Sequence, residues 1–185
     1  MRAGGRAPWS VVVLALVLTP CLLAEGVDLA LGVDPETLGP TLRAPPSAAH
    51  PLGTDALGRD HLSRLLHGGR VSLAVATLGA LLAFAVGAGL GLTAGWVGGR
   101  VEAALMRLTE ATLAVPKLPL LLVLAGLDVP AAAGLRAGPA SEILALGGLI
   151  GAFAWPDVAR LTRAATRSLR HRDFVRAAEG LGLGP

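Results

Sequence analysis

The stretch VSLAVATLGALLAFAVGAGLGLTAGWV, residues 71–97, decides the fold class of the chain. It carries no charged side chain and exceeds the roughly 20 helical residues that cross a bilayer core. Small residues recur at every fourth position and form one stripe on a helix. Because helices in lipid associate through close packing, the stripe predicts contact with a second helix, although a glycine-rich composition alone is the competing explanation. The stripe consists of Gly79, Ala83, Gly87, Gly91 and Gly95.

Three further apolar stretches lie at Ala7–Ala24, Ala111–Leu127 and Ala140–Trp155. The 185-residue chain is 53% hydrophobic and only 16% charged, which is too apolar for an ordinary water-soluble domain. We therefore predict an all-α integral membrane protein, a polytopic helical bundle with about four transmembrane helices. The last stretch repeats the small-residue spacing at Gly147 and Gly151, and at Gly148 and Ala152.

The first apolar stretch has two interpretations. Its basic start at Arg2 and Arg6 and its apolar middle also fit a cleaved signal sequence. Pro20 directly before Cys21 argues against a lipoprotein cleavage site, and since more membrane segments follow, we expect a retained first helix. Cys21 is the single cysteine, so an internal disulfide is impossible.

The distribution of arginines predicts the orientation in the membrane. A cluster follows the last apolar stretch, and the positive-inside rule places that end in the cytoplasm. Counting back through four spans puts the N-terminus in the cytoplasm too, and residues 25–70 outside. The first four arginines form one stripe, for which contact with anionic lipid headgroups is a better interpretation than voltage sensing. The cluster comprises Arg160, Arg163, Arg167, Arg170, Arg172 and Arg176.

The segment expected outside the membrane begins with a proline-rich linker, Gly32–His50. Leu62, Leu65 and Leu66 then share one face of a short helix. We expect this helix to lie on the membrane surface and to stop at Gly68–Gly69, before the next span begins.

Two charged residues near the third stretch are candidates for a translocation path. Lys117 lies between Pro116 and Pro119, and a lysine at the bilayer centre costs about 3 kcal/mol on insertion scales. The prolines leave backbone carbonyls in need of partners, which a wet path would supply. Glu110 lies near the start of the same span. A lysine that extends to the interface from a bent helix explains the same residues, so both explanations stay open.

A short polar helix is predicted in RDFVRAAEGLGLG, residues 172–184. Asp173 can cap the helix, and Gly182 is placed to end it. Two adjacent alanines, Ala177 and Ala178, leave a low and narrow surface between these ends. Such a helix suits insertion into a groove of a partner protein, and a solvated loop helix fits these residues equally well.

Three segments resemble one of the two permease subunits of bacterial peptide and nickel ATP-binding cassette importers. They are LGTDALGRDHLSRLLHGGRVSL (52–73), GWVGGRVEAALMRLTEATLAVP (95–116) and WPDVARLTRAATRSLRHRDFVRAAEGLG (155–182), in the family's order and spacing. The last is similar to the start of the EAA loop shared by importers of this class. The resemblance implies an inner-membrane permease of six spans. Its implied partners are a second permease, cytoplasmic ATP-binding subunits and an extracytoplasmic substrate-binding protein.

The resemblance also implies roles for particular residues. In this family the short helix of the EAA loop docks on the cytoplasmic ATPase and carries its motion to the membrane. Carried over by position, the docking residues are Arg176, Ala177, Ala178 and Gly182. Arg176 stands where the family usually has glutamate, and Glu179 where a basic residue is common, so the pair is kept with its charges exchanged.

The length departs from the family, whose members continue through two more spans. We therefore expect residues 51–185 to form a partial transmembrane domain that ends in the coupling helix, and residues 1–50 to form the first helix with its linker. A non-transporting membrane scaffold or an inactive permease fragment is the alternative. The cargo is not legible, because dipeptide, oligopeptide and nickel systems share these motifs.

Other function classes fit the sequence poorly. No Gly-x-x-x-x-Gly-Lys-Ser/Thr phosphate loop occurs, so we expect ATP hydrolysis on a separate subunit, and neither enzymatic activity nor a cofactor on this chain. The histidines lack a metal-ligand spacing such as His-Glu-x-x-His, although Asp55 and Asp60 could form a weak cation site. A channel is disfavoured because no pore-filter motif is present.

Overall fold

The computed structural model describes residues 7–34, 37–39, 41–125, 127, 134 and 138–182. Every regular element among these residues is an α-helix, with one isolated β-bridge between Thr54 and Asp60. Two of the helices are long and apolar enough to cross a membrane, α3 (His61–Val97) and α7 (Pro139–Arg170). The predicted all-α membrane fold is thus confirmed, whereas the number of four spans stays a prediction.

The chain forms two compact units, residues 1–73 and 74–185. The predicted domain boundary after residue 50 stays a prediction. The first unit contains α1 (Ala7–Leu22), α2 (Ala24–Leu31) and the beginning of α3. α1 and α2 are long and apolar enough for a span only when taken together, and a bend of 63° separates them. Pro20 lies in the last turn of α1, where its missing N–H and its ring favour a break.

A loop of residues 41–60, called here the polar loop, closes on itself through hydrogen bonds. Thr54 is buried at its centre. Its hydroxyl donates to the Thr41 carbonyl at 2.8 Å and accepts from the Ala44 N–H at 2.8 Å. A threonine side chain thereby satisfies backbone groups that no helix or sheet serves in this loop.

The end of the polar loop also starts α3. Buried Asp60 accepts a hydrogen bond from the Ser63 N–H at 2.8 Å, which satisfies one of the unpaired donors of the first helical turn. Its second carboxylate oxygen lies 2.9 Å from Nδ1 of His50. One acidic side chain therefore ties the loop to the helix that follows it.

Asp55 organises the turn before Asp60. One of its oxygens accepts from the N–H groups of Leu57 and Arg59, at 2.7 and 2.9 Å. The other accepts from Nη1 of Arg64 at 2.6 Å. The hydrogen bond from the Arg59 N–H is the largest cause that holds the pKa of Asp55 below its usual value, with the bonds from Leu57 and Arg64 acting the same way.

α3 runs without interruption through Gly68 and Gly69, so the predicted helix stop at this pair is wrong. A Cβ atom on Gly69 would come within 2.6 Å of the sulfur of Cys21 on α1. The glycine therefore makes room for a neighbouring helix and does not end its own. The leucines expected on a separate surface helix belong instead to the first turns of α3.

A hydrogen bond and an ion pair join α2 to the first turns of α3. Nε2 of His67 lies 2.6 Å from Oδ2 of Asp28, and Nη1 of Arg70 donates to Oε1 of Glu25 at 2.5 Å. The Asp28 carboxylate is nearly buried, whereas Glu25 is exposed. The basic side chains of α3 here have acidic partners on α2.

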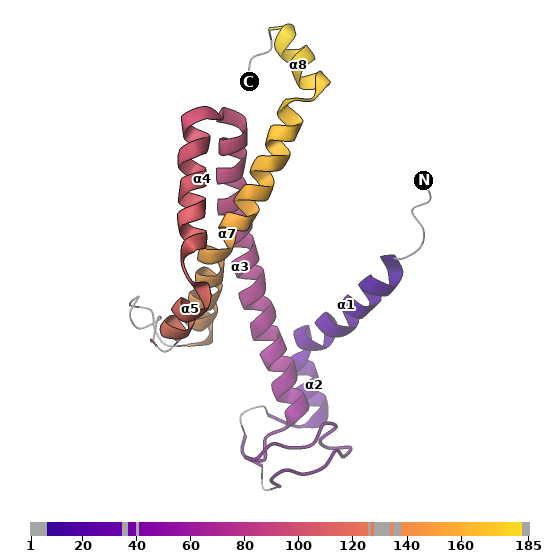
Figure 1. Cartoon of the computed structure of the whole chain (residues 1–185). Coiled ribbons are helices and arrows are strands. Elements are labelled where there is room, and N and C mark those ends of the chain that lie inside the picture. Colours follow the sequence, from indigo (N-terminus) through magenta and orange to yellow (C-terminus); the bar gives the residue numbers. More distant parts are fainter. Residues whose placement is uncertain are drawn as a thin grey trace. The chain divides into compact units, whose positions relative to one another are not determined.

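The second unit holds the rest of α3 together with α4 (Gly99–Ala114), α5 (Lys117–Ala125), α7 and α8 (Asp173–Gly180). α4 and α7 pack side by side, and both run beside this part of α3 (Figure 1). The predicted third span is divided between α4 and α5. Val115 is extended, with ψ of 127°, as expected of a residue before a proline.

Candidate functional site

Four glycines of α3 lie directly against α7, a contact called here the seam. A Cβ atom on Gly87 would come within 2.6 Å of the Trp155 carbonyl oxygen, and one on Gly91 within 2.5 Å of the Ala159 carbonyl oxygen. These neighbours are backbone atoms that cannot rotate away, so a larger residue would force the helices apart. The other two contacts are Gly79 with Ile150 and Gly95 with Thr166.

The seam is reciprocal, because glycines of α7 receive side chains of α3. A Cβ atom on Gly147 would come within 2.8 Å of Cδ2 of Leu78. One on Gly151 would come within 2.7 Å of Cβ of Leu82. Each helix therefore offers both notches and the side chains that fill them, as ridges pack into grooves between helices.

The remaining small residues of the two predicted stripes differ in their surroundings. Ala83 is only 3% exposed. Open space surrounds Gly148, and Ala152 is exposed. Of the two small-residue pairs singled out on α7, only the one formed by Gly147 and Gly151 faces α3.

A partly buried carboxylate joins α4 to α7 near the end of the seam. Glu102 accepts from Nε of Arg163 at 2.6 Å and from Nη1 of Arg167 at 3.2 Å, and its side chain is 16% exposed. These three residues are called here the Glu102 cluster. Charge-assisted hydrogen bonds of this kind are about twice as strong as neutral ones. The sequence does not indicate that Glu102 pairs with these arginines, because they lie 61 and 65 residues later and the packing of the helices decides the contact.

Arg170 continues the basic stripe by one more turn. Its Nη1 donates to the carbonyl oxygen of Trp96, and its guanidinium carbon lies 6.0 Å from the centre of the Trp96 ring. Such a cation–π contact adds to the hydrogen bond. Arg160, by contrast, is exposed. Three of the four arginines in the stripe thus contact α3 or α4, partners that the interpretation as a headgroup-facing stripe did not include.

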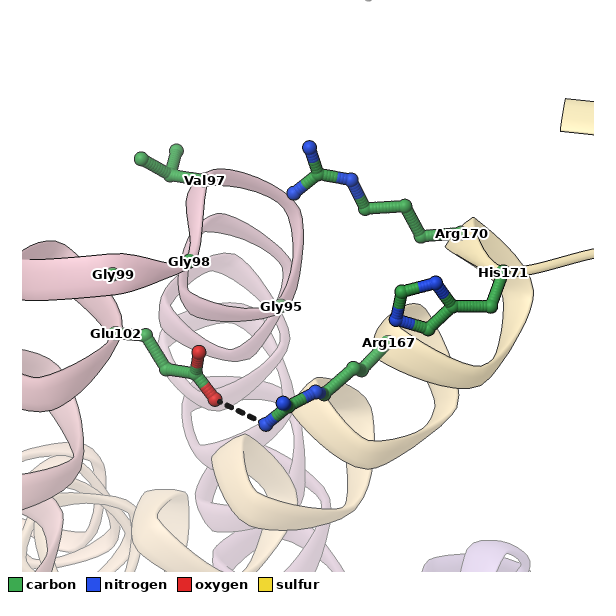
Figure 2. A pocket seen from close by; sticks show the side chains of 8 residues that line it. All are labelled: Gly95, Val97, Gly98, Gly99, Glu102, Arg167, Arg170 and His171. Atoms are coloured by element: carbon green, nitrogen blue, oxygen red, sulfur yellow. Dashed lines mark hydrogen bonds and ion pairs between the residues drawn. The ribbon is translucent and has the colours of Figure 1, made fainter. Parts of the chain in front are cut away.

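A cavity of about 430 Å³ opens beside this cluster, between the ends of α3 and α7 and the start of α4. Figure 2 shows the side chains of Arg167, Arg170 and His171 reaching toward it from α7, with Glu102 opposite them. Gly98 forms the turn with φ of +72°, in the left-handed region that favours glycine. The complete lining is Gly95, Val97, Gly98, Gly99, Glu102, Arg167, Arg170 and His171.

α8 follows α7 after only two residues and exposes apolar side chains. Phe174 is 67% exposed and Leu181, just beyond the helix, is 81% exposed. Ala177 lies between them and is exposed as well, so the three residues fall on one helical face. Gly182 has φ of +79°, as expected of a residue that terminates a helix. The side chains of Arg176 and Ala178, both predicted docking residues, lie outside the described part of the structure.

The two candidates for a translocation path have different surroundings. Nζ of Lys117, at the start of α5, lies 3.8 Å from Oδ2 of Asp157 on α7. Glu110 is exposed on α4. Asp157 was not singled out as a partner for Lys117, because only the packing of α5 near α7 brings the two together.

The suggested cation site at Asp55 and Asp60 does not gather further ligands. In the part of the chain that the structure describes, no group of three or more His, Cys, Asp or Glu side chains is arranged to hold a metal ion. Both carboxylates instead accept hydrogen bonds from the polar loop and from the first turn of α3.

Comparison with known families decides the classification. The profile of the family described as binding-protein-dependent transport system inner membrane component matches residues 87–185, more than half of the chain. The chain belongs to this family. The matched region holds most of the seam, the Glu102 cluster and α8, and the membership predicted from the three sequence segments is confirmed.

Curated relatives are transport permeases. A putative peptide permease protein of Brucella abortus is 33% identical over 171 residues, which cover 91% of this chain and 53% of the relative. The dipeptide transport system permease protein of Haemophilus influenzae is 35% identical over 136 residues, 74% of this chain and 42% of the relative. The nickel transport system permease protein of Escherichia coli K12 is 35% identical over 178 residues, 95% of this chain and 60% of the relative. The chain spans about half the length of these relatives.

Proposed function

We propose that the chain acts as a transmembrane permease subunit of an ATP-binding cassette importer and couples to a separate ATPase through α8. The observation that carries this proposal is the exposed face of Phe174, Ala177 and Leu181 on a short helix directly after α7. Helices that dock in a groove of another protein use anchors at this spacing. Membership of a transport family and the transport permeases among the relatives support the importer role.

The route by which motion at α8 reaches the membrane follows from the contacts of α7. α7 is one continuous helix from Pro139 to Arg170, so displacement of its end moves its apolar half. The Glu102 cluster carries the displacement to α4, and the seam carries it to α3. Arg176, Ala177, Ala178 and Gly182 are the residues proposed to contact the ATPase.

Lys117 and Glu110 are proposed to line part of the translocation path. Lys117 has Asp157 as a partner across two helices, and their side chains are 35% and 68% exposed within this chain. Charged residues inside membranes pair with one another or face water because an isolated charge in lipid is costly. An opposite-charge pair between α5 and α7 fits a path formed with a second permease subunit.

The proposed cargo is a peptide, with nickel as the alternative, since the relatives are named for both. A second permease, cytoplasmic ATP-binding subunits and an extracytoplasmic substrate-binding protein complete the proposed importer. We place the chain in the inner membrane with its N-terminus and α8 on the cytoplasmic side, on the strength of the arginine distribution.

Recovery of the ATPase subunit tests the proposal. The chain is tagged and co-expressed with the ATP-binding subunits of its host, and the double variant Phe174→Asp with Leu181→Asp is compared with the unchanged chain. Placing carboxylates on the apolar face is expected to lower recovery by about tenfold or more, because anchors of this kind dominate docking energy. Leu29→Asp on α2 is the matched control, since Leu29 is 86% exposed and is predicted to lie on the extracytoplasmic side of the membrane, away from the ATPase. Equal recovery from the double variant and the control would defeat the docking role.

A further inference from the structure

The cavity beside the Glu102 cluster has a positive surplus. Arg167 and Arg170 supply two guanidinium charges to its lining and Glu102 supplies one carboxylate charge, which leaves a surplus of one. Arg163, which lies outside the lining, and Arg167 both donate to Oε1 of Glu102, so the negative charge of this carboxylate is locally compensated. The cavity as a whole therefore attracts an anion.

The lining still has hydrogen-bond donors to offer. A guanidinium carries five N–H donors, and one donor of Arg167 contacts Glu102 while one donor of Arg170 contacts the Trp96 carbonyl. Figure 2 shows the Arg167 guanidinium directed toward Glu102 and the Arg170 guanidinium directed toward Val97, with the His171 ring between the two side chains. Planar guanidinium groups match the oxygens of a phosphate with two parallel hydrogen bonds.

The position of the cavity along α3 indicates the source of that phosphate. The uncharged stretch of α3 ends at Val97, and charged residues follow at Arg100 and Glu102, so the membrane interface lies at this end of the helix. The lining residues Gly95, Val97, Gly98 and Gly99 belong to the same end of the stretch. Trp96 is of the residue type that gathers at membrane interfaces. The cavity therefore lies at the depth of lipid headgroups.

We propose that this cavity binds one phosphate group, that of an anionic phospholipid headgroup, through Arg167, Arg170 and His171. Glu102 holds Arg167 in place and limits the positive charge, so that binding stays reversible. The proposal is independent of the docking of α8, because it concerns lipid bound by this chain alone.

Native mass spectrometry of the purified full chain measures the binding. The chain in detergent is titrated with phosphatidylglycerol or with phosphatidylcholine of the same acyl length, and the apparent affinity for the first bound lipid is read from the spectra. The double variant Arg167→Gln with Arg170→Gln is expected to lose about tenfold or more of its affinity for phosphatidylglycerol. The matched control, Arg107→Gln with Arg160→Gln, removes the same charge from exposed positions of α4 and α7 outside the cavity and is expected to change the affinity by less than about twofold.

A local reporter guards against misfolded variants. In a chain carrying Trp9→Phe and Trp155→Phe, Trp96 is the single tryptophan, and its emission is expected to shift on addition of phosphatidylglycerol. Arg167→Gln alone leaves Arg163 on Glu102 and Arg170 beside Trp96, and is expected to weaken the titrated response several-fold with unchanged helical circular dichroism.

Two outcomes would overturn the proposal. Equal losses in the cavity variant and its matched control would show a diffuse charge effect without a site. Inorganic phosphate titrated alone is the other arm: a Trp96 response to it, with no preference for phosphatidylglycerol over phosphatidylcholine, would remove the lipid as the ligand.

Discussion

The polar loop and the seam hold chain segments together by opposite means. In the loop, the side chains of Thr54, Asp55 and Asp60 bind backbone groups at 2.7 to 2.9 Å. In the seam, glycines such as Gly87 and Gly91 bring one helix against the carbonyl oxygens of another. One region adds polar side chains, and the other removes side chains altogether.

The difference follows from whether the backbone N–H and C=O groups of each region already have hydrogen-bond partners. A loop leaves N–H and C=O groups without partners, and polar side chains supply them. A helix has already paired those groups internally, so a second helix can gain only from close packing when the surroundings are lipid. A threonine therefore contributes most to stability in the loop, and a glycine contributes most in the seam.

The largest expected effect comes from filling the seam. Gly91→Leu would place a side chain where a Cβ atom alone comes within 2.5 Å of the Ala159 carbonyl oxygen. We expect destabilisation by about 3 kcal/mol or more, since α3 and α7 must separate to admit it. Thermal unfolding of the purified chain in detergent, followed by circular dichroism, measures the loss.

Gly89→Leu is the control for that change. Gly89 lies on the same helix with open space around it, so leucine there is expected to cost less than about 1 kcal/mol. If both variants unfolded at the same temperature, close backbone approach would not be what holds the two helices.

A smaller effect is expected from the polar loop. Thr54→Val keeps the shape of the side chain and removes the bonds to Thr41 and Ala44, at a cost of about 1–3 kcal/mol. Hydrogen–deuterium exchange of residues 41–60 should accelerate while exchange in α7 stays unchanged. Thr93→Val, at an exposed threonine of α3 that bonds only to its own helix, is expected to change neither. Faster exchange across the whole chain, or no change in the loop, would contradict this assignment.

The smallest expected effect is the loss of stability of the polar loop at low pH. The folded-state pKa of Asp55 is lowered by its hydrogen bonds, so its contribution is complete above the unfolded value of 3.8 and is lost as pH falls through the lower folded value. The protection factors of amides in the polar loop, corrected for the intrinsic pH dependence of exchange, should therefore fall as pH is lowered below about 4 and stay constant above about pH 5. Asp55→Asn should flatten this dependence, and an equally steep profile in that variant would point to another carboxylate.

Fold class and family were predictable because they rest on local patterns. An uncharged stretch such as Val71–Val97 has few alternatives to a membrane helix, and the motif segments carry the family directly. Four glycines of the small-residue stripe predicted on α3 lie against α7. The roles proposed for the docking and path residues stay predictions.

Pairings between distant residues were not predictable, because they depend on helix packing. Nothing in the sequence around Glu102 indicates which arginines it binds, 61 and 65 residues later. Nothing around Lys117 indicates that Asp157 is its partner. The helix stop predicted at Gly68–Gly69 is wrong, since a glycine can either end a helix or make room for a neighbouring one, and the sulfur of Cys21 beside Gly69 shows the second role.

The interlocking of Leu78 and Leu82 with Gly147 and Gly151 restricts how α3 and α7 can move past each other. Each leucine occupies a notch bordered by backbone, so axial slippage short of a full helical turn, about 5.4 Å, would drive it into the opposing chain. The pair therefore behaves as a single stiff rod against small shear forces. A force applied to the end of α7 is therefore transmitted as a rotation or tilt of α3 and α7 together.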